Sequence, residues 1–182
     1  MQTDASATHK KTDESSSSIV LCGFMSSGKT TIGKPLAKRL GYNFVDTDQL
    51  LISTFHMTIP EMFARGGETY FRDCEHEIAC MAADMPHTVI STGGGMMTFE
   101  RNARVLAESG IVIYIHQDFD TCYARLCTQP NRPLVKNNTR EDLHRMYDSR
   151  IASYQKYASY ILENHGSINE AVENLVCYLQ KR

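Results

Sequence analysis

Short apolar runs alternate with amphipathic stretches along most of the chain. The runs are rich in β-branched side chains and predict five strands, at residues 19–22, 43–45, 88–92, 111–115 and 160–162. Between them, apolar residues recur at helical spacing and predict helices at 29–40, 58–65, 68–83, 121–127, 141–157 and 167–180, with two more ending near His56 and Gly110. This alternation predicts an α/β protein, a three-layer α/β/α sandwich around a five-stranded parallel sheet.

The sequence GFMSSGKT, residues 23–30, directly follows the first predicted strand. Its spacing, G-x-x-x-x-G-K-[S/T], is that of a P-loop, whose backbone N–H groups surround phosphate oxygens at the N-terminus of a helix. In this motif we expect Lys29 to reach the β and γ phosphates of a nucleotide and Thr30 to offer its hydroxyl to Mg²⁺. The loop therefore indicates a phosphate donor and leaves the acceptor open.

Two further motifs also follow predicted strands. Asp46 and Asp48, in DTD, come after the second strand, and the glycines Gly93, Gly94 and Gly95 come after the third. One aspartate could hold Mg²⁺, directly or through water, while the other accepts a hydrogen bond from a substrate hydroxyl; a solvated turn or a helix N-cap is the alternative. The glycines could let the backbone approach a ligand closely or could simply form a flexible turn. Because the carboxyl ends of parallel strands share one edge, we expect both motifs beside the P-loop.

Three arginines have more than one interpretation. Arg72 lies three residues before Glu75 on a predicted helix, where the pair could be a surface salt bridge or an arginine positioned to bind a carboxylate. Arg132 lies in the polar segment 128–140, which has the length of a lid, and could stabilise charge on a phosphate during its transfer. Arg150 by itself resembles any exposed helical arginine.

The bulk composition limits the classes of function. The 182 residues are 42% hydrophobic and 22% charged, which is typical of one globular domain, and we expect it at 19–182 after a disordered polar tail at 1–18. The net charge of −2 provides no basic field for nucleic acid, and no run approaches the ~18 apolar residues of a membrane span. The six cysteines form no C-x-x-C pair, which favours reduced thiols and a cytoplasmic location.

Taken in order, the P-loop, DTD, FRDCE, GGG, RPL and SRIASY resemble the shikimate kinase family over essentially the whole chain after residue 18. The resemblance implies a nucleoside-monophosphate-kinase-like fold with a substrate-binding helical region and a mobile lid at about 128–140. It also implies an enzyme that uses ATP and Mg²⁺ to phosphorylate the 3-hydroxyl of shikimate, giving shikimate 3-phosphate and ADP in chorismate and aromatic amino-acid biosynthesis. ATP and shikimate would then be its partners, and we expect a monomer that binds neither nucleic acid nor membrane.

The resemblance also implies roles for residues at matching positions. Lys29, Asp48 and Arg132 would be catalytic, with Asp48 as the base or orienting group for the substrate hydroxyl. Thr30 would bind Mg²⁺ directly and Asp46 through water. The residues implied to bind ATP are Ser26, Ser27, Gly28, Lys29, Thr30, Thr31, Arg125 and Arg132. Those implied to bind shikimate are Asp48, Phe63, Phe71, Arg72, Gly93, Gly94, Gly95 and Arg150, the two arginines holding its carboxylate.

The P-loop departs from the family pattern G-x-M-G-x-G-K at one position, where Ser26 stands in place of glycine. A serine is tolerated there if its φ is negative. A positive φ would cost about 1 kcal/mol and would affect nucleotide affinity rather than the type of reaction.

Three other functions stay open at this stage. They are a kinase for another hydroxy acid such as gluconate, a nucleotide-dependent binding module without catalysis, and a nucleoside monophosphate kinase. The paired arginines and the three glycines favour shikimate over gluconate. The intact Lys29, Thr30, Asp48 and Arg132 speak against lost catalysis. A nucleoside monophosphate kinase would need a pocket that binds the nucleobase of its acceptor, and the sequence offers no candidate residues for one.

Overall fold

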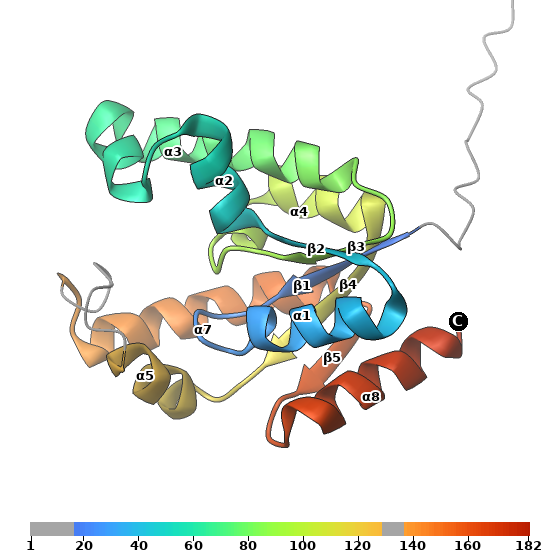
Figure 1. Cartoon of the computed structure of the whole chain (residues 1–182). Coiled ribbons are helices and arrows are strands. Elements are labelled where there is room, and N and C mark those ends of the chain that lie inside the picture. The colour runs from blue at the N-terminus through green and yellow to red at the C-terminus, as the bar shows by residue number, and fades with distance from the viewer. Residues whose placement is uncertain (1–16, 129–136) are drawn as a thin grey trace, which may run out of the picture.

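The protein folds around a sheet of five parallel strands. The computed structural model describes residues 17–128 and 137–182. Its sheet has the order β2-β3-β1-β4-β5, and all four neighbouring pairs are parallel (Figure 1). The strands are β1 (Ser18–Cys22), β2 (Asn43–Asp46), β3 (Thr88–Ser91), β4 (Gly110–His116) and β5 (Tyr160–Glu163). The predicted five-stranded parallel sheet is confirmed.

Helices cover both faces of this sheet, which completes the three layers. They are α1 (Lys29–Leu40), α2 (Thr47–Phe55), α3 (Ile59–Ala83), α4 (Glu100–Ser109), α5 (Phe119–Cys127), α7 (Arg140–Tyr157) and α8 (Ile168–Gln180), labelled as in Figure 1. Buried side chains of α1 and α8 pack on one face, and those of α2, α3, α4, α5 and α7 pack on the other. The predicted α/β/α sandwich is therefore confirmed.

The strand β1 shows why its run is continuously apolar. Val20 and Cys22 contact the larger cluster of helices, whereas Ile19 and Leu21 contact α1 and α8. All four are at most 2% exposed. Side chains alternate between the faces of a strand, so a central strand between two helical layers has no polar face. This buried strand carries the P-loop at its carboxyl end.

The two glycines at Gly66 and Gly67 interrupt α3, as the sequence predicts. Neither has helical φ and ψ, and Gly67 has a φ of 67°. The helix begins with the expected capping box, in which the Thr58 hydroxyl accepts a hydrogen bond from the Glu61 N–H, and the Glu61 carboxylate accepts one from the Thr58 N–H. A short segment bearing Phe63 thus precedes the long buried part of the helix.

The start of β1 corrects one boundary. Ser18, which the sequence assigns to the tail, is the first residue of the strand and is 2% exposed. Its hydroxyl donates to the carbonyl of Met85 and accepts from the N–H of Thr88, so its burial leaves no polar group unpaired. Residues 1–16 of the expected tail, and residues 129–136 of the expected lid with Arg132, lie outside the described residues. No helix in the described ranges is long and apolar enough to cross a bilayer.

Candidate active site

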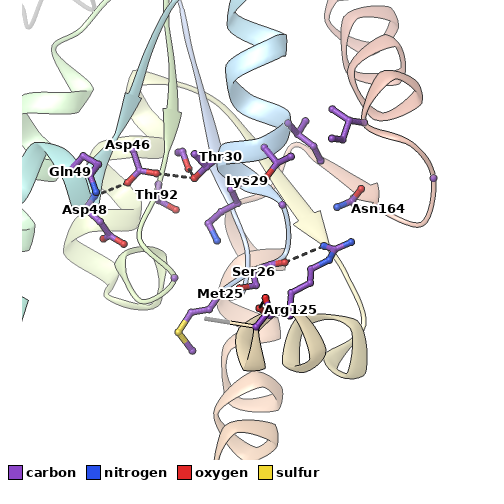
Figure 2. Close-up of a pocket in the computed structure, with 18 residues that line it drawn as sticks. Met25, Ser26, Lys29, Thr30, Asp46, Asp48, Gln49, Thr92, Arg125 and Asn164 are labelled. Carbon is purple, nitrogen blue, oxygen red and sulfur yellow. Dashed lines mark hydrogen bonds between the residues drawn. The ribbon is translucent and has the colours of Figure 1, made fainter. Parts of the chain in front are cut away.

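A cleft of about 590 Å³ lies at the carboxyl edge of the sheet. Its walls come from the P-loop, the DTD segment, the end of β3, α5 and the loop between β5 and α8 (Figure 2). Each of these segments lies at or after the carboxyl end of a strand of the sheet. The motifs that the sequence assigns to one crevice therefore meet in this cleft.

Lys29 is held inside the P-loop by the loop's own backbone. Its Nζ donates to the carbonyl oxygens of Gly23 at 2.9 Å and Phe24 at 2.8 Å. Burial lowers the pKa of Lys29 to about 8, and the negative charge of Asp48 opposes this shift. The ammonium is therefore positioned in the loop but is less firmly protonated than an exposed lysine.

Three oxygen-bearing side chains meet beside Lys29. The Thr30 hydroxyl donates to Asp46 Oδ2 at 2.8 Å and lies 3.1 Å from the hydroxyl oxygen of Ser91 (Figure 2). Carboxylate and hydroxyl oxygens are the donors that Mg²⁺ prefers, so this set fits the expected ion. Asp46 also accepts from the Asp48 N–H at 3.1 Å as the N-cap of α2, so the N-cap interpretation of Asp46 is correct, and its role at the ion stays a prediction.

The DTD and GGG motifs contact each other directly. A Cβ added at Gly93 would overlap the carboxylate of Asp48, so this glycine is needed for the close approach of the two segments. The Thr47 hydroxyl accepts a hydrogen bond from the Gly93 N–H at 2.8 Å, and both groups are buried. Thr47, the middle residue of DTD, thus fixes the glycines beside Asp48.

The arginines Arg72 and Arg150 converge on the same glycines from two different helices. A Cβ added at Gly95 would lie 3.3 Å from a guanidinium nitrogen of Arg72 and 3.8 Å from one of Arg150. Arg150 also donates to the carbonyl of Gly94 at 3.3 Å. Both guanidinium groups therefore lie against the glycine segment, close enough to hold one anionic group between them.

The salt bridge between Arg72 and Glu75 is not the surface pair that the spacing alone allows. Its N–O distance is 2.8 Å, and the Glu75 side chain is only 5% exposed. Burial raises the pKa of Glu75, while the hydrogen bond from Arg72 opposes the rise. The buried Glu75 carboxylate thus helps to hold the Arg72 guanidinium in place. Glu68 accepts a second hydrogen bond from this guanidinium at 3.1 Å.

The aromatic residues expected at the substrate lie beside Arg72. Phe63 and Phe71 stack with their ring centroids 4.7 Å apart, and the Arg72 guanidinium carbon lies 5.0 Å from the Phe71 centroid. The ring of Phe99, which no sequence motif places here, is closer still to the Arg72 guanidinium carbon, with its centroid at 4.3 Å. Phe71 is buried and Phe63 is 41% exposed.

Ser26 has a φ of +60°. This is the positive φ for which the sequence predicted a cost in backbone strain. Arg125 on α5 donates to the Ser26 carbonyl at 3.1 Å (Figure 2), and Asn164 after β5 donates to the Ser27 carbonyl at 2.7 Å. The loop is therefore held from two elements that lie far from it in the sequence.

The cleft brings together most of the expected nucleotide and metal residues. Those that line it are Ser26, Gly28, Lys29, Thr30, Thr31, Asp46, Asp48, Gly94 and Arg125. Ser27 is not among the lining residues, and Arg72, Arg150 and the other two glycines adjoin the cleft through Gly94.

Sequence reasoning missed several residues at this edge. Gln49, Ser91, Thr92 and Asn164 line the cleft, and the pair of Arg72 with Glu75, which the sequence did indicate, is more buried than expected. Ser91, Thr92 and Asn164 stand at or just after the ends of predicted strands, so the strand-end rule could have found them. The burial of Glu75 had no signal in the sequence beyond its spacing from Arg72.

Comparisons with a family model, with related sequences and with solved structures all point to the same family. The family model described as shikimate kinase matches residues 25–180. The shikimate kinase of Ruegeria pomeroyi is 32% identical over 180 residues, covering 98% of this chain and 89% of the relative, and that of Geobacter sulfurreducens is 35% identical, covering 90% and 91%. The structure of shikimate kinase from Acinetobacter baumannii in complex with shikimate superposes with a TM-score of 0.86 at 30% identity, covering 92% of this chain and 95% of that one.

The bond between Thr47 and Gly93 supports a stability prediction. We expect Thr47→Val, which keeps the shape of the side chain, to lower the free energy of unfolding by about 1–3 kcal/mol, because the buried Gly93 N–H loses its acceptor. Urea denaturation measures the loss. Thr47→Ser is the matched control, since it retains the hydroxyl and removes one methyl group. Equal losses in the two variants would show that the hydroxyl contributes nothing.

Proposed function

The chain belongs to the shikimate kinase family, and from this premise we propose that it transfers the γ-phosphate of ATP to the 3-hydroxyl of shikimate. The observation that carries the proposal is the convergence of Arg72 and Arg150 on the glycine segment, with Asp48 at the other end of the same segment. Two cations suit the carboxylate of a hydroxy acid, and a carboxylate suits its hydroxyl groups. This arrangement adjoins the P-loop, where the transferable phosphate would lie.

The nucleotide would bind along the P-loop. The backbone N–H groups at 26–31 and the Lys29 ammonium would surround its phosphates, at the N-terminus of α1. Arg125 lines the cleft beside Ser26, where its planar guanidinium would pack on the adenine ring. To reach the phosphates, Lys29 would exchange its present bonds to loop carbonyls for bonds to phosphate oxygens.

Thr30 and Asp46 would hold Mg²⁺, Thr30 through its hydroxyl and Asp46 through water. Their present hydrogen bond shows that both oxygens already point to one place. Bound there with ATP, the ion would neutralise part of the phosphate charge. Ser91, 3.1 Å from the Thr30 hydroxyl, orients this pair.

Asp48 would accept a hydrogen bond from the attacking hydroxyl and orient it toward the γ-phosphate. Phosphoryl transfer depends on in-line positioning and on charge stabilisation more than on covalent help. Lys29 would stabilise charge on the phosphate from the loop side. The lid arginine, Arg132, would do so from the opposite side; it lies outside the described residues, and its role stays a prediction.

ATP and shikimate are the partners that this proposal requires. It also retains a monomeric state, a cytoplasmic location and the absence of nucleic-acid or membrane partners as expectations. All six cysteines are free thiols, which agrees with a reducing compartment.

The test of the proposal is ADP release by the purified protein with Mg²⁺ and ATP. Shikimate, gluconate and AMP are offered as acceptors at equal concentration. We expect release that depends on shikimate, because the paired arginines suit its carboxylate. Release with gluconate or AMP alone would identify a different acceptor, and no release with any of the three would favour a binding module.

A second prediction concerns Asp48. We expect Asp48→Asn and Asp48→Ala to lower kcat by roughly 10²–10⁴-fold, because the acceptor for the hydroxyl proton is lost, and to leave ATP affinity largely intact. Steady-state kinetics and calorimetric ATP titration measure the two effects. Asp148→Asn, an exposed carboxylate on α7 outside the cleft, is the matched control. Near-normal turnover in both Asp48 variants would remove this residue from the mechanism.

A third prediction follows from the lowered pKa of Lys29, which is about 8 in the free protein. Phosphate charge beside the ammonium would raise this pKa in the complex, so nucleotide binding above pH 8 must take up a proton. We expect the Kd for ADP to rise by up to about tenfold per pH unit above pH 8 and to change little from this cause below it. Calorimetry at pH 7–9.5 in buffers of different ionisation enthalpy measures both effects. Equal affinity at pH 8 and pH 9.5, without proton uptake, would contradict the prediction.

A further inference from the structure

Ser26 has an unfavourable backbone conformation in the wall of the cleft. Its φ of +60° lies in the left-handed region, which side chains other than glycine adopt at a cost. The other positive-φ positions of the P-loop, Gly23 and Gly28, are both glycines. The loop thus uses glycine wherever its path requires a positive φ, except at Ser26.

Contacts from outside the loop hold Ser26 in this conformation. The Ser27 N–H donates to the Phe24 carbonyl at 3.2 Å, which closes the turn around Ser26. Arg125 donates to the Ser26 carbonyl and Asn164 to the Ser27 carbonyl, so the peptide planes on both sides of the turn are fixed. The serine therefore cannot relax without breaking hydrogen bonds to other elements.

The hydroxyl of Ser26 adds a second cost. Its oxygen is buried, and it makes no hydrogen bond to any of the residues that the structure describes. A buried polar group without a partner destabilises the fold, so in native proteins such a group calls for an explanation, for example a functional role or a bound water or ion. Ser27 also has a buried hydroxyl without a partner in the described ranges, but Ser27 does not line the cleft, and its hydroxyl lies about 3.0 Å from where a Cβ on Gly23 would be.

Ser26 differs from Ser27 because it lines the cleft together with Lys29 and Thr30. Residues in strained conformations persist at functional sites where the strain positions a group that the function needs. Glycine at this position would remove both costs and would lose only the hydroxyl. The hydroxyl is therefore the feature that the strained serine supplies.

We propose that the Ser26 hydroxyl, after a rotation about its Cα–Cβ bond that turns it into the cleft, donates a hydrogen bond to a phosphate oxygen of the bound nucleotide, at the β or the γ phosphate. This rests on the proposed function, in which the nucleotide phosphates lie in the P-loop. The bond adds a side-chain donor to the backbone N–H groups of the loop. Hydrogen bonds from a hydroxyl to an ionised oxygen are stronger than bonds between neutral groups.

The experiment compares Ser26→Ala with Ser26→Gly in the full chain. Alanine removes the hydroxyl and retains the backbone cost, whereas glycine removes both. Calorimetric titrations with Mg²⁺ and either ADP or the non-hydrolysable triphosphate AMP-PNP are made without an acceptor, so they do not depend on the acceptor being shikimate. Ser109→Ala, at the end of α4, is the matched control, because its hydroxyl bonds only locally to the Leu106 carbonyl.

We expect both Ser26 variants to bind more weakly by about tenfold, since each loses a hydrogen bond to a charged group. Weaker binding of AMP-PNP alone would place the bond at the γ phosphate, and weaker binding of both nucleotides would place it at the β phosphate. We also expect Ser26→Gly to raise the Tm by about 2–4 °C as the backbone cost disappears, which shows that the variant is folded. Unchanged affinity of Ser26→Ala for both nucleotides would overturn the proposal.

Failure of the proposed function is distinguishable from this result. If the wild-type protein binds nucleotide but releases no ADP with shikimate, the choice of acceptor fails, and the Ser26 comparison still stands. If shikimate-dependent turnover is present and the Ser26→Ala affinities equal those of the wild type, only the role of the hydroxyl fails.

Discussion

The parallel direction of all five strands is the constraint on which the rest of the structure depends. It places every strand's carboxyl end at one edge, and the segments that follow β1, β2 and β3 supply the P-loop, the DTD residues and the glycines. Helices on both faces then bury β1 completely, so the P-loop begins at the end of a fully buried strand. The topology of the sheet alone therefore places the phosphate-binding loop next to the segments proposed to bind the acceptor.

The site concentrates charge without giving the whole protein a strong field. Arg72 is paired with the buried Glu75, and Lys29 is bonded to loop carbonyls. Asp48 lies against Gly93, at the opposite end of the glycine segment from the arginines. The proposed sites for a small anionic substrate and a polyphosphate therefore rely on local charges, while the chain as a whole carries a net charge of only −2. Because each of these cationic side chains already has hydrogen-bond partners, its orientation is set before a ligand binds.

Much of this arrangement could be predicted from the sequence, for identifiable reasons. Alternating apolar runs and helical patterns defined the sheet, and the strand-end rule brought Asp48 and Gly93 together. The rule says nothing of residues in the middle of helices, so the positions of Arg72 and Arg150 followed only from resemblance. The φ of Ser26 depends on contacts from other elements, and no local pattern encodes it. The hydrogen bond from Gly93 to Thr47 was missed because nothing in the sequence shows where a buried hydroxyl points.

The bonds from Lys29 to the carbonyls of Gly23 and Phe24 have a consequence for the kinetics of the loop. The ammonium draws these two carbonyls toward itself, and the loop keeps its curved path while no phosphate is present. The entropy of ordering the loop is therefore lost during folding and not during association. Association is slower where binding requires a conformational change, so a loop that is already ordered favours a fast on-rate. The Lys29 ammonium thus keeps the loop ready for a nucleotide until it exchanges its own hydrogen bonds.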